Sequence, residues 1–326
     1  MINRRLTVVF ILALLAASLA AEAQPSKKVR IGYLSGNPPS DTKDAFDAFQ
    51  TKLHALGYIE GQNLLFEARY ADGRYERLPQ LAADLVRLKV DVIFAYGTPG
   101  SLAAKNATRV IPIVFAPVSD PVLAGLVATL TRPGGNVTGV TLNNPELSAK
   151  RVSLLKEAVP AASRVVVLAN PDFAPSPSLV AETRRGARVL GMQIQVLEIR
   201  QPQELAKAFG TMAAGKTHAV VILPDPMFIA ERRRIVELAA TSRISAMYHL
   251  RQFVEAGGLM SYGADYVEAF QQGALLVDKI LKGAKPADLP VEQPWRFPLV
   301  INLKTAKALG LTIPQPLLLR ADQVVE

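Results

Sequence analysis

The chain has 326 residues, half of them apolar and a fifth charged, which is enough for two α/β domains with separate hydrophobic cores. It contains no cysteine, so disulfide bonds, thiolate nucleophiles and cysteine-bound metal ions are excluded. The formal net charge is +9, but lysine and arginine are scattered. The densest run, Arg232-Arg233-Arg234, stands beside Glu231 and Glu237, so we interpret it as a solvated helix face and expect no nucleic-acid partner.

Residues 1–23 have the features of a secretory signal peptide. Basic Asn3-Arg4-Arg5 precedes an apolar stretch from Leu6 to Ala21, and Ala21-Glu22-Ala23 matches the small-x-small cleavage pattern. The apolar stretch is short for a membrane span, although an uncleaved N-terminal anchor is the alternative. No cysteine follows it, so a lipid anchor is excluded. We therefore expect export and cleavage before Gln24.

From residue 29 onward, short apolar runs alternate with candidate helices, as expected for strands buried on both faces of a parallel sheet. A first series has strands at 29–34, 63–70, 91–96, 112–116 and 136–142, with helices at 41–56, 75–88, 99–108 and 120–130. A second has strands at 164–169, 193–199, 218–223, 244–248 and 259–262, with helices at 146–158, 178–190, 203–214, 228–242 and 266–283. Two such series predict two doubly wound α/β lobes, the first with strand order 2-1-3-4-5.

The tail of the chain predicts a hinge of several strands between the lobes. A chain that has filled the second lobe and then continues must go elsewhere, and 296–302 has the pattern of a further strand. Joints rich in Pro and Gly lie near 143–146, 263–265 and 290–295. We therefore assign 24–142 plus 264–294 to lobe 1, and 143–263 plus 295–326 to lobe 2.

One perfect motif match stands in the wrong context. Residues 210–217 (GTMAAGKT) fit the phosphate-loop pattern GxxxxGK[ST], which requires a strand before it and a helix after it. Here a predicted helix precedes the motif and a predicted strand follows. Gly215 is then a helix C-cap and Lys216 a cation in the last turn, so no nucleotide is expected.

Signatures of an enzyme are absent from the sequence. It contains no GxSxG, GxGxxG or HExxH, and His54, His218 and His249 are isolated. Asp172 and Asp225 follow predicted strands and could serve an exported hydrolase or isomerase, but Asn-Pro-Asp and Pro-Asp-Pro are also ordinary turn chemistry. We expect a binding protein, not an enzyme, with no cofactor and no metal ion.

Polar and turn-forming residues at the strand ends predict a ligand site. Ligands of open α/β sheets bind at the carboxyl ends of strands, where helix N-termini present free N–H groups. The endings before residue 125 and after residue 160 would face each other across a cleft. The predicted ligand-binding residues are Ser35, Asn37, Gly97, Thr98, Pro117, Asp120, Asn170, Asp172, Asp225 and Tyr248. Ser119 offers another neutral donor, and Tyr33, Tyr96 and Tyr262 could also cover a flat apolar group.

Six stretches carry a family resemblance that covers nearly all of the chain from Lys28. They are 56–63 (LGYIEGQN), 112–116 (PIVFA) followed by Asp120-Pro121, 132–139 (RPGGNVTG), 255–263 (EAGGLMSYG), 277–283 (VDKILKG) and 299–311 (LVINLKTAKALGL). With them the chain resembles substrate-binding proteins of ABC transporters, in the group that includes tryptophan- and tyrosine-binding lipoproteins. Unlike the anchored members, it lacks the lipid-bearing cysteine.

The resemblance implies a type I periplasmic binding fold, with two lobes, a three-stranded hinge and a solute held between the lobes. It further implies a periplasmic monomer that closes about the hinge and delivers its solute to an inner-membrane ABC permease. The solute would be an amino acid or an aromatic carboxylate, a choice that the motifs leave open.

Overall fold

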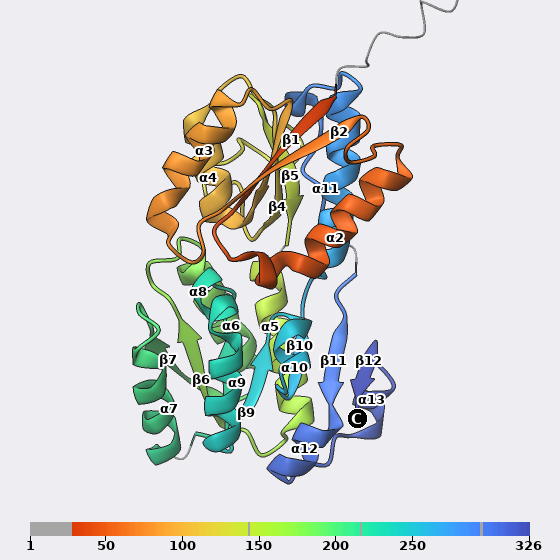
Figure 1. Ribbon diagram of the computed structural model, residues 1–326. Helices are drawn as coiled ribbons and strands as arrows, with labels where there is room; N and C mark the ends of the chain where they lie inside the picture. The colour runs from red at the N-terminus through yellow and green to blue at the C-terminus, as the bar shows by residue number, and fades with distance from the viewer. Residues whose placement is uncertain (1–27, 143, 216, 294–295) are drawn as a thin grey trace, which may run out of the picture.

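The computed structural model describes residues 28–142, 144–215, 217–293 and 296–326. These residues form two α/β lobes, one above the other in Figure 1, each built on a mostly parallel sheet with helices on both faces. The predicted fold class, two doubly wound lobes, is confirmed. The predicted signal peptide lies outside the described residues. In the described parts of the chain, no helix is long and apolar enough to cross a membrane.

Lobe 1 contains a five-stranded parallel sheet in the order β2-β1-β3-β4-β5, which confirms the predicted order. Its strands are β1 (Val29–Ser35), β2 (Leu64–Tyr70), β3 (Val92–Tyr96), β4 (Ile113–Val118) and β5 (Val137–Thr141). Its helices are α2 (Pro39–Ala55), η1 (Tyr75–Arg77), α3 (Leu78–Arg87) and α4 (Gly97–Ala107). Strands β3, β4 and β5 are buried throughout, which explains their continuous apolar runs.

Lobe 2 contains a seven-stranded sheet in the order β12-β11-β10-β9-β8-β6-β7. Its strands are β6 (Arg164–Ala169), β7 (Gln193–Glu198), β8 (Ala219–Ile222), β9 (Ser245–Tyr248), β10 (Met260–Tyr262), β11 (Leu299–Asn302) and β12 (Gln323–Val325). Strand β11 runs antiparallel to β10, because the chain re-enters this sheet from the other lobe. Its helices are α5 (Asn144–Ala158), α6 (Ser176–Val189), α7 (Glu204–Ala214), α8 (Pro226–Ala230), α9 (Arg232–Thr241), α10 (Arg251–Glu255), α12 (Leu303–Leu309) and α13 (Gln315–Leu318).

Two predicted helices differ in the structure. The helix predicted over 120–130 is wrong, because that segment forms turns. Asp120 Oδ1 accepts hydrogen bonds from the N–H groups of Val122 and Leu123, and Gly125 then takes a φ of +68°, which ends the turn. The helix predicted over 228–242 is two helices, α8 and α9, which meet at Glu231.

Helix α11 (Tyr266–Leu281) follows the strands of lobe 2 but packs on lobe 1. It lies beside α2 (Figure 1), and Gly273 allows it to approach the ring of Phe94 in β3. After the short helix η2 (Pro286–Asp288), Glu292 bridges to Val140 of β5, and the chain then returns to lobe 2 as β11. Together with the step from β5 to α5, the chain passes between the lobes three times.

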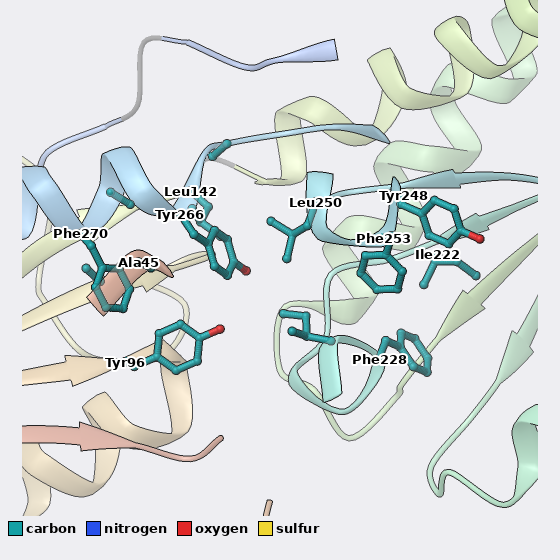
Figure 2. Packing of buried hydrophobic residues seen from close by; sticks show 14 of the residues in the cluster. Ala45, Tyr96, Leu142, Ile222, Phe228, Tyr248, Leu250, Phe253, Tyr266 and Phe270 are labelled. Atoms are coloured by element: carbon teal, nitrogen blue, oxygen red, sulfur yellow. The ribbon is translucent and has the colours of Figure 1, made fainter. Parts of the chain in front are cut away.

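A buried hydrophobic cluster continues from one lobe into the other. Figure 2 shows Tyr96 and Tyr266 of lobe 1 directed toward Leu250 and Phe253 of lobe 2. The ring centroids of Tyr96 and Tyr266 lie 6.2 Å apart in an edge-to-face arrangement. Both of these rings belong to lobe 1, and the cluster that they join extends to Leu250 and Phe253, so the lobes pack against each other beside the cleft.

Candidate ligand-binding site

A pocket lies between the lobes at the carboxyl ends of their strands. Lobe 1 contributes the segments after β1, β3 and β4, and lobe 2 contributes those after β6 and β8. Its walls are made by Gly36, Asn37, Tyr75, Tyr96, Gly97, Thr98, Pro99, Gly100, Pro117, Ser119, Leu142, Phe173, Pro224, Asp225, Pro226, Ile229 and Tyr266. This is the location that the strand-end argument predicts.

The N-terminus of helix α4 forms one wall in lobe 1. Gly97 starts the helix with a φ of +69°, a conformation that favours glycine, and the preceding Tyr96 makes no side-chain cap. The first N–H groups of the helix and the Thr98 hydroxyl therefore stand at the pocket. Such a helix terminus carries partial positive charge and suits a carboxylate.

Asn37 and Tyr75 form the neighbouring part of that wall. Ser35 Oγ accepts a hydrogen bond from Asn37 N at 3.1 Å and donates one to Asn37 O at 2.9 Å. The Tyr75 hydroxyl donates to Asn37 Oδ1 at 3.0 Å. Asn37 is 2% exposed, and its Nδ2 has no hydrogen-bond partner among the described residues. A buried donor is thus available at the pocket.

Asp225 is the ionisable group on the lobe 2 side. Its Oδ1 accepts hydrogen bonds from Met227 N and Phe228 N, which caps helix α8, and its Oδ2 accepts one from Asn170 Nδ2 at 3.1 Å. Burial raises the pKa of Asp225 from 3.8 to about 6, against the lowering effect of these three hydrogen bonds. The side chain is therefore ionised at neutral pH and lacks a cationic partner among the described lining residues.

Aromatic side chains cover the rest of the pocket. Tyr75, Tyr96 and Tyr266 come from lobe 1, and Phe173 follows β6 in lobe 2. Burial raises the pKa of all three tyrosine hydroxyls above the usual 10, so they stay neutral. Neutral rings around one carboxylate and one helix terminus suit a flat apolar group that carries two opposite charges.

Five of the predicted residues come together in the pocket walls, namely Asn37, Gly97, Thr98, Pro117 and Asp225. Ser35 and Asn170, which were also predicted to bind the ligand, are not among the walls but contact two of the wall residues. Ser35 is fully buried, and its hydroxyl is used to fix Asn37, while the Asn170 amide is used to hold Asp225. Both are short polar side chains at strand ends, and each forms a hydrogen bond with a neighbouring residue instead of pointing into the cleft.

The structure places three further predicted residues away from this pocket. Asp120 caps the turn after β4. Asp172 is exposed and forms an ion pair with Arg200. Tyr248 is 1% exposed in the core of lobe 2, where its ring stacks on Phe253 with centroids 4.7 Å apart. A polar residue after a strand can turn to either side, and the sequence does not fix that choice.

Three aromatic wall residues lay outside the sequence prediction: Tyr75, Phe173 and Tyr266. Tyr75 begins a 3-10 turn after an edge strand, and Tyr266 begins a helix that crosses back from lobe 2. Phe173 had a usable signal, because it directly follows the strand-end turn Asn170-Pro171-Asp172. Tyr33, which lies within β1, and Tyr262, which ends β10, are not among the pocket walls.

An ion pair joins the lobes next to the pocket. Arg232 Nη1 of α9 lies 3.0 Å from Asp41 Oδ1 of α2, and the two side chains are 17% and 12% exposed. The interpretation of Arg232 as part of a solvated helix face is therefore wrong. Asp41 and Arg232 line a second groove beside the pocket. Tyr96 and Tyr266 line both the groove and the pocket.

The phosphate-loop motif at 210–217 has the reversed order that the sequence predicts, since α7 ends at Ala214 and β8 begins at Ala219. Lys216 lies outside the described residues. We predict that ATP does not bind, because the motif ends one helix and leads into a strand, whereas phosphate binding needs the N-terminus of a helix directly after the motif. Calorimetric titration tests this, and micromolar affinity that is lost in Lys216→Ala would contradict it. In the described ranges, no three side chains are grouped to hold a metal ion.

Comparison with known proteins identifies relatives along nearly the whole chain. Residues 39–325 match the family model described as ABC transporter substrate binding protein. A protein of Clostridioides difficile (strain R20291) named Tyrosine-binding protein is 28% identical over 291 residues, which cover 89% of this chain and 83% of the relative.

Two solved structures of relatives differ in how well they superpose on this chain. A Streptococcus pneumoniae ABC domain in complex with L-Trp is 28% identical, has a TM-score of 0.86, and is covered completely by 92% of this chain. The ligand-free, open structure of a substrate-binding protein with adhesive properties from Clostridium difficile is 26% identical and has a TM-score of 0.69, with 91% and 99% of the two chains covered. The chain therefore superposes better on the L-Trp complex than on the ligand-free, open structure.

Proposed function

The chain belongs to the family of ABC transporter substrate-binding proteins, and we propose that it captures a zwitterionic aromatic amino acid between its two lobes. Members of this family bind small solutes for delivery to membrane permeases and are not enzymes. The alternative of a hydrolase or isomerase that uses Asp172 or Asp225 is therefore set aside. One observation carries the proposed solute: a buried carboxylate on lobe 2 and a helix N-terminus on lobe 1 share one pocket.

The charges of the pocket favour an amino acid over an aromatic carboxylate. Ionised Asp225 attracts an ammonium group and repels an anion, while the α4 terminus and Thr98 offer donors to a carboxylate. A ligand with a carboxylate alone would leave the Asp225 charge buried without a cationic partner, which is costly. The tyrosine-binding relative and the L-Trp complex support the same solute class.

We propose that the protein works by closure about the hinge formed where the chain passes between lobes 1 and 2. The carboxylate would bind lobe 1 and the ammonium group would bind Asp225 of lobe 2, so a complete amino acid favours the closed state over the open one. The ion pair between Asp41 and Arg232 would stabilise that state as well. The better superposition on the L-Trp complex supports a closed arrangement.

A paired ligand screen tests the proposal. L-tryptophan, L-tyrosine and L-phenylalanine should raise the melting temperature and bind in calorimetry without being turned over. A ligand at 100 times its dissociation constant stabilises by about 2.7 kcal/mol. Indole-3-propionate and tryptamine, which each lack one charged group, should bind more weakly than L-tryptophan. Absence of binding by all three amino acids, or tighter binding of indole-3-propionate, would refute the proposed solute class.

Thr98→Val is expected to weaken the binding of L-tryptophan by about 10- to 150-fold, because the ligand carboxylate loses one charge-assisted hydrogen bond worth roughly 1.5–3 kcal/mol. The change is nearly isosteric at the rim of the cleft, so the melting temperature should stay the same. Calorimetry and thermal unfolding of the same variant check both statements. Unchanged affinity would place the carboxylate elsewhere, and a lower melting temperature would make Thr98 structural.

We also propose that the protein is a periplasmic monomer served by an inner-membrane permease. The family is typically extracytoplasmic, and the basic and apolar N-terminal segments with Ala21-Glu22-Ala23 support export. The exported protein is expected to begin at Gln24. Intact-mass measurement of material from the periplasm checks this, and a chain that still begins at Met1 would contradict it.

A further inference from the structure

We propose that Tyr75 is a positioning residue that aims the Asn37 side-chain amide at the carboxylate of the bound amino acid. This inference rests on the proposed function for the identity of the ligand. It assigns the pocket a third donor beside the α4 terminus and the Thr98 hydroxyl. It also gives Tyr75 a role that does not require direct contact with the ligand's charged groups.

Every polar group of Asn37 except the side-chain NH₂ has a hydrogen-bond partner. The backbone N–H and C=O of Asn37 both bond to Ser35 Oγ, and the side-chain Oδ1 accepts from the Tyr75 hydroxyl. With Oδ1 turned to Tyr75, Nδ2 points the other way. It is buried and has no partner within the described part of the chain, although the residue lines the pocket. A buried N–H without an acceptor is costly, so this donor is satisfied when a ligand acceptor enters.

Gly36 fixes the position of Tyr75. A Cβ atom added to Gly36 would lie 2.3 Å from Tyr75 Cε1, so only glycine lets the ring pack this closely on the backbone. Gly36 O also accepts a hydrogen bond from Gly73 N at 2.8 Å, which ties the segment before Tyr75 to the segment after β1. The ring is therefore held against the residue next to Asn37, and its hydroxyl reaches the amide.

The geometry of the sheet brings the Asn37 amide near the carboxylate position. Strands β1 and β3 are neighbours, and Ser35 pairs with Tyr96 in their register. Asn37 lies two residues beyond Ser35, and Thr98 lies two residues beyond Tyr96. No lysine or arginine stands among the described lining residues, so a carboxylate in this pocket depends on neutral donors. Several such donors are needed to replace the water that a carboxylate loses.

Matched substitutions test the inference with L-tryptophan and tryptamine as probes. Tyr75→Phe removes only the hydroxyl and should weaken L-tryptophan binding by about 2- to 12-fold, while tryptamine, which has no carboxylate, should bind as before. In an Asn37→Ala background, Tyr75→Phe should cause no further loss. Asn37→Asp should weaken L-tryptophan more than Tyr75→Phe does, because it sets a carboxylate against a carboxylate. Equal losses for both probes, or additive losses in the double variant, would overturn the inference.

A measurement without ligand separates this inference from the proposed function. In ¹⁵N relaxation experiments, the Asn37 side-chain amide should be rigid in the wild type and mobile in Tyr75→Phe. Tyr58→Phe is the matched control, because it removes a hydroxyl that donates to Asp278 at 3.0 Å away from the pocket. An amide equally rigid in Tyr75→Phe and the wild type would refute the positioning role. If no amino acid binds the wild type, the proposed function fails, and the relaxation data still decide the role of Tyr75.

Discussion

Asp225→Asn is expected to weaken L-tryptophan binding by roughly 30- to 5,000-fold, the range for losing one partner of a buried, hydrogen-bonded charge pair. The ligand's ammonium group would enter the cleft and meet a neutral amide instead of a carboxylate. The helix should survive the change, because an asparagine oxygen can accept the same N–H groups of Met227 and Phe228 that Asp225 caps. Calorimetry at pH 7.5 measures the affinity, and circular dichroism confirms the fold.

The same carboxylate gives binding and stability opposite dependences on pH. In the ligand-free protein the pKa of Asp225 is raised to about 6 by burial, so L-tryptophan affinity should fall about tenfold per pH unit below about 6. For folding the sign is reversed, because the raised pKa means that the folded state favours the protonated form. The contribution of Asp225 to the free energy of unfolding is fully present below pH 3.8 and is lost as the pH rises through about 6. The free energy of unfolding of Asp225→Asn should therefore change less between pH 4 and pH 8 than that of the wild type, because asparagine has no charge to bury.

Indole-3-propionate provides the control for this assignment. It lacks the ammonium group, so its affinity should rise as Asp225 becomes protonated, opposite to the trend for L-tryptophan. Neither ligand should show a pH dependence near 6 in Asp225→Asn. If wild-type affinity for L-tryptophan is constant between pH 4.5 and 7.5, or if Asp225→Asn binds as tightly as the wild type, the ammonium group is not held by Asp225.

The sequence was most informative where local pattern and position in the sheet coincide. Continuous apolar runs identified the strands buried on both faces, and their alternation with helices led to the order of the lobe 1 sheet. Because all strands of that sheet are parallel, their endings necessarily meet at one edge. Gly97 and Thr98 could be placed at the pocket for this reason.

The remaining parts of the site depend on tertiary contacts that have no local signature. Tyr75 reaches the pocket because Gly36 accepts its ring, a contact between residues 39 positions apart that no periodicity reveals. Arg232 lies in a basic run that is typical of a solvated helix, and its partner Asp41 stands in the other lobe. Asp172 and Asp225 follow equivalent turns, but Asp225 caps a helix at the cleft while Asp172 pairs with Arg200 at the surface. Which strand-end residue faces a ligand is decided by packing between lobes.

Gly263→Ala is expected to destabilise the protein strongly, because this residue lies where the chain leaves β10 for lobe 1. An added Cβ would stand 2.1 Å from the carbonyl oxygen of His249 and 3.2 Å from Arg151 Nη2. Both neighbours are buried, and Arg151 Nε donates to Tyr262 O at 2.7 Å, so the groups that would have to give way are themselves held in place. Overpacking against a fixed backbone atom should cost roughly 3 kcal/mol or more. Thermal unfolding should show a melting temperature lower by about 5 °C or more.

Gly210→Ala is the matched control, since Gly210 is exposed in the middle of helix α7 and a Cβ there meets no atom within 4 Å. The free energy of unfolding of Gly210→Ala should be higher by roughly 0.5–1 kcal/mol, because alanine loses less backbone entropy in a helix. If Gly263→Ala has the same melting temperature as the wild type, the segment that leads from β10 to lobe 1 can shift to admit a methyl group. In that event, a change of radius of gyration in solution scattering would be expected, since a shift at this passage alters how the lobes meet. A protein with unchanged melting temperature and unchanged radius would contradict the close packing that the His249 contact implies.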